Sequence, residues 1–406
     1  MKVLFIGDTA ATGFGTVTFG LGTELLKLGL DVRFVSLNEG TDQLIPPAFE
    51  GRVAMLGQKN GWLSLGTPEG VVRTSQRVRE MFSGGVFEDG WTPEKALVVG
   101  DVGSLKMSHL LEMIPEGFPI WHYVPIEGMD SPPKWATIWE HVSPVAMCEF
   151  GADEIERVTG SRPPVVYHGI DTESFWPVSP FKPIVLTDGK TLIKLTSKVE
   201  CKRFFGVEGP LIFRADANMP RKMYASLLRS LAPVLSHHPE AQFRFHCRVQ
   251  DQGGDLADEV SKYAIDIQNR MSPTGLYPCD RKLLNAMYNA ADVYVSSSAE
   301  GFGLTIAEAL ACGTPVVGLG YSSVPEVVGN GGTCVPVGGL VDSIYSCLWA
   351  RPDEGRFTEA VEFYITHPAR AREAGMLGSM HVREFSWKLA AQQFAALLEQ
   401  RVEVAA

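Results

Sequence analysis

The chain has 406 residues, of which 45% are hydrophobic and 20% are charged, a composition typical of globular proteins. This length predicts two domains with separate hydrophobic cores. The net charge of −11 argues against a general polyanion-binding surface, because nucleic-acid binding usually needs clustered lysine and arginine side chains, although it leaves room for a local basic groove.

The cysteines and the apolar segments indicate the compartment. The seven cysteines are widely spread, odd in number and form no Cys-x-x-Cys pair, so the sequence predicts neither a disulfide framework nor a zinc site. The apolar run at residues 1–8 is too short for a signal sequence, and no other run is long enough to cross a bilayer. We therefore expect a cytoplasmic protein without a transmembrane segment.

The N-terminal segment predicts the first unit of a parallel sheet. Residues 3–6 form a short apolar run typical of a buried strand, and residues 8–15 form a turn-rich loop. Apolar residues then recur at helical spacing over residues 17–28, and residues 31–35 begin the next strand. The order is strand, glycine loop, helix and strand.

The glycine loop of this unit has two interpretations. Gly13 and Gly15 form a Gly-x-Gly after the first strand, a pattern that also opens dinucleotide-binding folds. Thr18, however, occupies the position of the third glycine in a complete Gly-x-Gly-x-x-Gly. The pattern alone is therefore weak, and a tight turn packed under a helix is the structural alternative.

Two further strands of the first half end beside polar side chains. One apolar run ends at Asp101, and the next contains His122 and is followed by Glu127 and Asp130. Ligands bind at the carboxyl ends of strands in open α/β sheets, so both strand ends should open on one cleft. His122 lies either near the reaction centre or in the core as a hydrogen-bonded histidine. Glu127 and Asp130 either contact a substrate or are solvated.

The second half repeats the alternating pattern after a linker rich in proline and serine. A helix is expected over residues 198–206, and the strand at residues 211–214 ends at Arg214. Arg221 and Lys222 follow in the next loop, ahead of another helix. Three basic side chains are thus expected near one strand end, with an ordinary surface basic pair as the alternative.

The most informative run places two carboxylates around a glycine turn. Glu300 and Glu308 lie eight positions apart, with Gly301 and Gly303 between them and a small-residue helix expected over residues 304–311. Glycine lets a backbone approach a phosphate closely, and a helix N-terminus carries about half a positive charge, so the turn favours a diphosphate. Because the anion would repel carboxylates, we expect these two to bind hydroxyl groups of a sugar and a ribose on either side.

This run, with its turn, helix and following strand, resembles retaining glycosyltransferases of the GT-B fold, in glycosyltransferase family four. In a second similar segment, which closes the first domain in that family, His168 replaces the usual asparagine. The resemblance covers most of the chain and is strongest from Arg214 to Pro336. The segments that fit the family pattern are residues 165–177, 275–278, 322–328, 331–336 and 385–387.

The resemblance implies an α/β protein in which two Rossmann-like, doubly wound domains face a deep interdomain cleft. Residues 1–178 are expected to form the N-terminal, acceptor-side domain. Residues 179–385 are expected to form the C-terminal domain that binds the nucleotide sugar. The last helix, residues 386–406, is expected to cross back and complete the first domain.

The resemblance also implies roles around the donor. Arg214 and Lys222 would clamp the diphosphate, although Phe213 replaces the usual glycine before Arg214, so that Arg221 could share or replace its role. Glu300 would orient the sugar hydroxyls and Glu308 the ribose. The residues implied in catalysis are Arg214, Lys222, Glu300 and His122. Those implied in donor binding are Gly13, Gly15, Arg221, Leu276, Tyr277, Gly301, Phe302, Gly303, Leu304, Thr305 and Glu308.

The acceptor is the least determined part of the interpretation. Asp101, Glu127 and Asp130 are candidates for the acceptor side, together with the segment at residues 38–92, where the resemblance is weakest. A saccharide, a small molecule, a protein or a modified nucleic acid would each be compatible as the acceptor. The oligomeric state is likewise open.

The resemblance implies transfer from a UDP- or GDP-sugar with retention of anomeric configuration. The departing phosphate would take the acceptor proton, so no protein nucleophile is needed. No Asp-x-Asp metal signature is evident, and we expect neither a metal nor a permanently bound cofactor. Two alternatives are a non-catalytic nucleotide-binding protein of Rossmann type and a transferase that acts on a modified nucleic-acid base.

Overall fold

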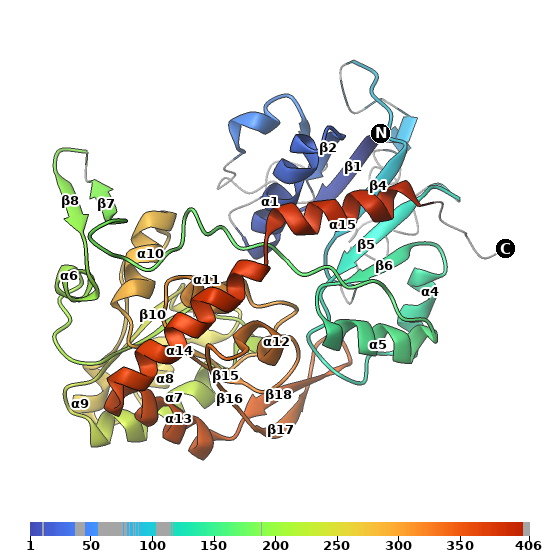
Figure 1. The fold of residues 1–406 in the computed structure, drawn as a ribbon. Coiled ribbons are helices and arrows are strands. Elements are labelled where there is room, and N and C mark those ends of the chain that lie inside the picture. Colours follow the sequence, from blue (N-terminus) through green and yellow to red (C-terminus); the bar gives the residue numbers. More distant parts are fainter. Residues whose placement is uncertain are drawn as a thin grey trace.

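A computed structural model arranges the chain as two α/β domains (Figure 1). The acceptor-side segment expected at residues 38–92 falls largely outside the part that is described. The structure describes residues 1–9, 12–36, 45–55, 76, 79–80, 82–83, 85, 87, 89–102, 115, 117–187 and 189–400.

The first domain is built on a six-stranded sheet in which every strand pair is parallel. The strand order is β3-β2-β1-β4-β5-β6, so the chain starts in the middle, builds one half and then crosses to the other. This is a doubly wound sheet. The strands are β1 (Lys2–Gly7), β2 (Asp31–Ser36), β3 (Val53–Met55), β4 (Lys95–Val99), β5 (Ile120–Val124) and β6 (Ser143–Ala146).

Both faces of this sheet are buried, which explains its continuous apolar strands. Val3 and Phe5 of β1 belong to one hydrophobic core, and Leu4 and Ile6 belong to another. Side chains alternate between the faces of a strand, so the two cores lie on opposite sides of the sheet. The helical segments of this domain are α1 (Gly13–Lys27), α4 (Ala136–Trp139), α5 (Glu149–Thr159) and the 3-10 turns η1 (Pro47–Phe49) and η2 (Pro133–Trp135).

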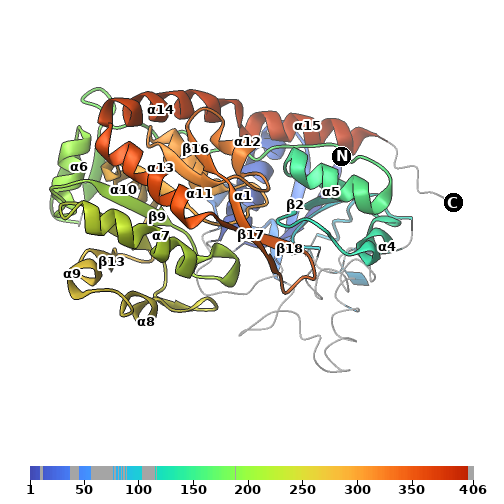
Figure 2. The ribbon, with the colours of Figure 1, turned by 90° about the horizontal axis from the view of Figure 1, so that it is seen from below.

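The C-terminal helix α15 (Trp387–Glu399) packs on the first domain, as expected. Its buried residues, Phe394 among them, share a core with β1 and α1. A Cβ atom at Gly20 of α1 would lie only 2.5 Å from the Trp387 ring, so a glycine is needed there. Figures 1 and 2 show α14 (Pro368–His381) along the second domain and α15 continuing over the first.

The second domain repeats the topology of the first. Its six parallel strands are ordered β13-β10-β9-β14-β15-β16. The first strand along the chain, β9, is again central, and the expected pair of Rossmann-like domains is confirmed. The strands are β9 (Leu211–Ala215), β10 (Gln242–His246), β13 (Met271–Pro273), β14 (Val293–Ser296), β15 (Val316–Leu319) and β16 (Gly332–Val335).

Helices and three hairpins complete the second domain. The helical segments are α6 (Lys198–Phe204), η3 (Pro220–Lys222), α7 (Tyr224–His237), α8 (Leu256–Val260), α9 (Ile265–Gln268), α10 (Arg281–Ala290), α11 (Leu304–Ala311), α12 (Val324–Val328), α13 (Glu354–Thr366) and η4 (Val382–Glu384). The hairpins are β7 (Ile184–Thr187) with β8 (Leu192–Leu195), β11 (Gln250–Asp251) with β12 (Gly254–Asp255), and β17 (Val337–Asp342) with β18 (Leu348–Pro352). Among the described helices, none is long and apolar enough to cross a membrane.

A carboxylate of the second domain caps a helix of the first. Glu326 of α12 accepts hydrogen bonds from the backbone N–H groups of Glu149 (2.9 Å) and Phe150 (3.0 Å), at the start of α5. It also accepts one from the hydroxyl of Tyr167 (2.8 Å). The first N–H groups of a helix lack acceptors within the helix, so this contact satisfies them from across the domain boundary.

Candidate functional site

The carboxyl ends of β9 and β14 meet at the centre of the second sheet, where its strand order reverses. Doubly wound sheets bind ligands at such a reversal, in the crevice beyond the strand ends. The loop after β9 holds Asp216 and the turn η3, and the loop after β14 holds Ser298 and Glu300. The two loops bring their polar side chains together at this point.

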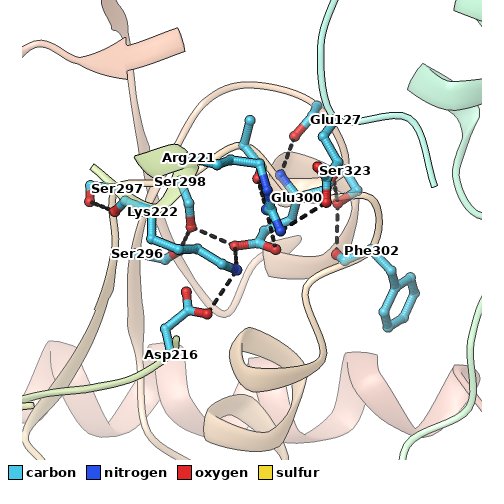
Figure 3. A network of polar contacts seen from close by, with 12 residues as sticks. Glu127, Asp216, Arg221, Lys222, Ser296, Ser297, Ser298, Glu300, Phe302 and Ser323 are labelled. Carbon is cyan, nitrogen blue, oxygen red and sulfur yellow. Dashed lines mark hydrogen bonds and ion pairs between the residues drawn. The ribbon is translucent and has the colours of Figure 1, made fainter. Parts of the chain in front are cut away.

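Lys222 is held between two carboxylates at the centre of this group (Figure 3). Its Nζ lies 2.7 Å from Asp216 Oδ1 and 2.6 Å from Glu300 Oε1. The Ser298 hydroxyl donates to the same Glu300 oxygen at 2.5 Å. A lysine ammonium has three N–H bonds, so the two carboxylates fix its position and leave one bond for a further acceptor.

Arg221 binds the second oxygen of Glu300 and reaches the first domain. Its Nη1 lies 3.0 Å from Glu300 Oε2 and also donates to the Ala299 carbonyl, and its Nη2 lies 2.9 Å from Glu127 Oε1. Burial alone would raise the pKa of Glu300, but the charges of Lys222 and Arg221 outweigh it and hold the pKa below its usual range. Glu300 is therefore ionised at neutral pH. We call Glu127, Asp216, Arg221, Lys222 and Glu300 the ion cluster.

Arg214 lies beneath the ion cluster. Its side chain is 0% exposed, and its guanidinium donates to the Ser297 hydroxyl (2.7 Å) and to the Lys222 carbonyl (2.8 Å). It also packs over the ring of Tyr224, 4.4 Å from the ring centroid. With these contacts Arg214 holds the backbone of η3 in place, and Arg221 and Lys222 are the basic side chains that lie nearer the crevice.

The turn Gly301-Phe302-Gly303 sets the start of α11. Gly303 has a φ of +102°, a conformation that favours glycine, and no side chain caps the helix. A Cβ atom at Gly303 would lie 3.6 Å from Glu300 Cγ, so the ion cluster adjoins the helix N-terminus. The Phe302 ring points away from the cluster (Figure 3) and contacts the ring of His168, with 4.7 Å between centroids.

The glycine loop of the first domain faces this same helix. Gly13 is exposed at the start of α1, and a Cβ atom placed on it would lie 3.8 Å from Leu304 Cδ1 at the start of α11. Thr12 caps α1 by accepting a hydrogen bond from the buried Gly15 amide (3.0 Å). The N-termini of two helices, one from each domain, thus approach each other across the crevice. Thr305 is the second residue of α11 and so lies at this same place.

Glu308 lies one turn into α11, beside a tyrosine hydroxyl and an arginine. Tyr288 donates to it at 3.0 Å, and Arg281 Nη2 lies 3.8 Å away. Burial raises the pKa of Glu308 to about 7 despite the opposing charge of Arg281. Leu276 and Tyr277, expected near the base, are both exposed, and the Tyr277 ring lies over His246 with 5.1 Å between centroids.

His122 is enclosed in the first sheet. It is fully buried in β5, its Nε2 lies 2.9 Å from the Gly100 carbonyl, and its Nδ1 accepts from Trp139 Nε1 at 3.3 Å. Burial lowers the pKa of this histidine to about 4, so the ring is neutral. With both nitrogens engaged in the core, the expected role near the transferred sugar gains no support, and we leave His122 out of the proposed reaction centre.

Two of the three acidic candidates of the first domain, Asp101 and Glu127, lie near each other. Glu127 joins the ion cluster, and Asp101 follows β4 on the same side of the sheet. Burial raises the pKa of Asp101 to about 6 and that of Glu127 to about 8, even though the charge of Arg221 opposes both shifts. Asp130 is exposed, with a φ of +57°, and stands apart from these two.

Several side chains at the site were not singled out from the sequence. Asp216 binds Lys222 together with Glu300. Its position could have been noticed in the sequence, because an acidic residue follows Arg214 by two positions at a strand end. Ser298 had no comparable signal, because serine is common in loops. Within the part of the chain that the structure describes, no group of three or more His, Cys, Asp or Glu side chains is placed to hold a metal ion.

Comparisons with known sequences point to the same part of the chain. Residues 211–349 match the family described as glycosyl transferases group 1. The chain is 29% identical over 267 residues to alpha-maltose-1-phosphate synthase of Mycobacterium tuberculosis, covering 61% of this chain and 60% of that protein. It is 33% identical over 172 residues to D-inositol 3-phosphate glycosyltransferase of Rhodococcus erythropolis, covering 42% of this chain and 36% of that protein. The chain thus spans about 60% or less of the length of these relatives.

Solved structures match the fold over the whole chain. Sucrose-phosphate synthase from Thermosynechococcus elongatus superimposes with a TM-score of 0.72 at 16% identity, covering 98% of both chains. Anabaena Alr3699/HepE, solved in complex with UDP-glucose, has a TM-score of 0.67 at 15% identity, covering 98% of this chain and 99% of that chain. At such low identity these likenesses concern the fold alone.

Proposed function

We propose that the protein transfers a sugar from a nucleoside diphosphate sugar to an acceptor hydroxyl, because residues 211–349 match the group 1 glycosyl transferases and the chain has the GT-B fold. One observation supports this proposal more strongly than any other. The ion cluster places Lys222 and Arg221 beside the uncapped N-terminus of α11, at the strand-order reversal of the second sheet. This arrangement is suited to a leaving diphosphate.

The proposed diphosphate site combines fixed charges and backbone N–H groups. The free N–H bond of Lys222 and the first N–H groups of α11 stabilise the charge that develops on the diphosphate as the glycosidic bond breaks. Asp216 and Glu300 hold the ammonium in position beforehand, so little reorganisation is needed during the reaction. In this proposal Arg221 takes the second basic role and Arg214 positions the loop.

The proposed donor then extends along α11. Glu308 binds the ribose hydroxyls one turn into the helix, and the exposed loop with Leu276 and Tyr277 lies against the base. Glu300, whose carboxylate is already oriented by Lys222 and Ser298, contacts the sugar hydroxyls on the other side. Anabaena Alr3699/HepE was solved with UDP-glucose, which makes a UDP-sugar the first donor to test.

We propose further that the transfer retains the anomeric configuration and needs no metal ion. The acceptor oxygen attacks on the face that the diphosphate leaves, and the departing phosphate takes the proton, so that no protein nucleophile takes part. Lys222 and Arg221 supply the positive charge that a metal would otherwise provide. Transfer is expected to continue in excess EDTA, and the product anomer can be identified by NMR; complete loss in EDTA with recovery on adding Mg²⁺ would contradict the metal-independent part.

The test of the donor half requires no knowledge of the acceptor. Purified protein is incubated with UDP-glucose or GDP-mannose alone, and release of the nucleoside diphosphate is measured, with thermal shift as a parallel measure of binding. Saturable binding and slow hydrolysis of one donor support the transferase. Binding of nucleotides without hydrolysis or transfer would favour the alternative of a non-catalytic nucleotide-binding protein.

The acceptor belongs to the first domain in this proposal. The names of the similar proteins contain maltose-1-phosphate and inositol 3-phosphate, so a phosphorylated small molecule is one candidate class for this chain. Glu127 contacts Arg221 of the ion cluster, so the acceptor side begins directly beside the proposed sugar position. We also propose a cytoplasmic location, since the donors are cytoplasmic metabolites.

A further inference from the structure

The segment of residues 181–206 differs in charge from the rest of the chain. Its six basic and two acidic side chains give it a net charge of +4, whereas the whole chain carries −11. The segment contains the β7–β8 hairpin and α6, which begins three residues after β8 ends. Figure 1 shows both elements at the end of the second domain that lies away from the first. The exposed basic side chains of the segment are Lys182, Lys190, Lys194 and Arg203.

The outer face of the hairpin is both apolar and basic. Val185 of β7 pairs with Lys194 of β8, and Leu192 lies two positions before Lys194 on the same face. The alternate residues, such as Ile184 and Leu195, are buried in the core of the second domain. The outer face therefore has no protein layer over it among the described residues, and Leu192 is 74% exposed.

A closed turn just before the hairpin holds Phe181 outward, with its side chain 100% exposed. The Ser179 N–H donates to the Lys182 carbonyl (3.2 Å), and the Lys182 N–H donates to the Ser179 hydroxyl (3.1 Å). The indole N–H of Trp176 donates to the same Lys182 carbonyl (3.0 Å), and Pro180 fixes one backbone dihedral of the turn. The backbone of the turn is thus held by three hydrogen bonds while the phenyl ring stays in solvent.

The helix α6 adds to this surface. Val199 is 62% exposed, and Arg203 lies four positions further on, on the same side of the helix. Cys201, on the other side, belongs to the core of the second domain. We call the following residues the basic apolar patch: Phe181, Val185, Leu192, Lys194, Val199 and Arg203.

The patch combines two properties that a lipid surface recognises. Single exposed apolar side chains are normal, but three that are more than 60% exposed lie within residues 181–199, beside exposed cations. At the surface of an anionic bilayer, apolar side chains enter the boundary between headgroups and acyl chains, and lysine and arginine side chains meet the phosphates. The charge of the patch is therefore complementary to such a surface.

Two other partners match the patch less well. Nucleic-acid backbones are bound by basic and polar side chains, and such binding leaves the exposed phenylalanine, leucine and valine without a role. A second copy of the chain, joined by a twofold axis through the patch, would place this cationic surface against itself. Only an anionic lipid surface uses both the charge and the apolar side chains.

We infer that the basic apolar patch docks the protein on an anionic lipid bilayer. Phe181 and Leu192 enter the headgroup region, and Lys194 and Arg203 contact lipid phosphates. The patch shares no residue with the ion cluster. The inference is independent of the proposed function, because binding to vesicles requires neither a donor nor an acceptor.

The test is sedimentation of the full chain with vesicles of two compositions. One is phosphatidylcholine alone, and the other contains about one third phosphatidylglycerol. We expect binding to the anionic vesicles to be about tenfold stronger or more. This binding should weaken several-fold in about 1 M NaCl, where the Debye length is about 3 Å.

Three variants divide the contributions of the patch. Phe181→Ser should weaken binding to the anionic vesicles about tenfold or more, because it removes a large apolar side chain. Phe181→Trp should retain binding, because tryptophan is favoured at the membrane interface. The double variant Lys194→Gln with Arg203→Gln should weaken binding about tenfold and remove most of its salt dependence. All three positions are exposed, so circular dichroism should show an intact fold.

Matched controls carry the same changes elsewhere in the second domain. Ile265→Ser removes a side chain that is 69% exposed on α9. Arg356→Gln with Arg370→Gln removes two exposed cations from α13 and α14. Both controls should bind the anionic vesicles as the wild type does. The two double variants change the net charge equally, so a difference between them locates the binding at the patch.

The outcomes decide the inference whether or not the transferase is confirmed. Absence of binding to the anionic vesicles overturns it, and so does binding that Phe181→Ser and the double patch variant leave unchanged. Stronger binding to duplex DNA than to vesicles, unaffected by Phe181→Ser, would identify a nucleic-acid surface instead. A dimer in sedimentation velocity that Phe181→Ser dissociates would identify a second copy as the partner.

Discussion

The two domains share one strand order but differ in what stands beyond their central strands. In the second domain, β9 and β14 lead to the ion cluster, where Lys222 and Arg221 balance buried carboxylates. In the first domain, the corresponding strands β1 and β4 lead to acids and hydroxyl groups. Asp8 accepts from the Thr12 hydroxyl at 2.5 Å, and Asp101 follows β4.

In our proposal, the same backbone platform serves a different kind of ligand in each domain. The sheet supplies a crevice at its strand-order reversal in both domains, and the loop residues decide the charge of what can bind there. A cationic loop beside a helix N-terminus favours an anion, and an acidic loop favours hydroxyl groups. In our proposal the first binds the donor diphosphate and the second the acceptor.

Removing Lys222, the cation at the centre of the ion cluster, should have the largest effect of the changes considered. Lys222→Ala removes the charge beside the proposed diphosphate and is expected to lower kcat by about 10²–10³-fold. It also takes one cation from two buried carboxylates, leaving Glu300 to Arg221 and Asp216 to Arg214, so the free energy of unfolding should fall by about 3 kcal/mol. Turnover per folded molecule, with folding followed by circular dichroism, is the measurement.

The matched control for this change is Arg229→Ala, which breaks the ion pair to Glu354 on the surface of the same domain. The side chain of Arg229 is about half exposed and lies away from the crevice, so turnover should stay at the wild-type value and the free energy of unfolding should fall by no more than about 1 kcal/mol. A folded Lys222→Ala variant with wild-type kcat would show that the ion cluster is structural and does not stabilise a leaving group.

A histidine of the first sheet provides the second test, through pH. The pKa of His122 falls from 6.5 to about 4 on folding, so between these pH values the unfolded chain binds the proton and the folded chain does not. The free energy of unfolding therefore falls as the pH falls, by up to about 3 kcal/mol from this residue. In His122→Gln this loss should disappear from urea unfolding curves, and turnover at pH 7 should persist. Loss of turnover with an intact fold would return His122 to the reaction centre.

Removal of the second carboxylate tests the donor orientation along α11. Glu308→Ala should raise the donor KM about tenfold, because buried hydroxyl contacts each contribute about 1–2 kcal/mol. The pKa of Glu308 is about 7, so the fraction ionised rises through neutral pH, and the wild-type donor KM should decrease between pH 6 and 8. That dependence should vanish in the variant. Glu359→Ala, an exposed acid on α13, serves as control, and an unchanged donor KM in Glu308→Ala would remove the ribose assignment.

The smallest effect is expected at the Glu326 contact between the two domains. Glu326→Gln retains one acceptor oxygen but loses the charge at the start of α5, so the free energy of unfolding should fall by about 1 kcal/mol. Chemical denaturation is the measurement, and Glu384→Gln, at an exposed acidic position, is the comparison. Equal stability of the two variants would mean that water replaces this interdomain cap.

Local sequence pattern and the family resemblance were enough to predict the main strands and helices of the second domain. The strand ending at Arg214 and the spacing from Glu300 to Glu308 lie in one contiguous stretch, and parallel strands bring consecutive loops to the same edge. The helices expected at residues 198–206 and 304–311 are present as α6 and α11. The sequence therefore predicted the two sheets, the return of the last helix and the neighbourhood of the ion cluster.

Side-chain direction and long-range docking were decided by the tertiary structure. Arg214, Arg221 and Lys222 look alike in sequence, and only packing shows that the first is enclosed while the other two lie nearer the crevice. His122 faces the core because alternate side chains of a strand point to opposite faces. The β17–β18 hairpin meets the first domain at the antiparallel bridge between Leu348 and Met129, residues more than 200 positions apart, and no local pattern encodes such an approach.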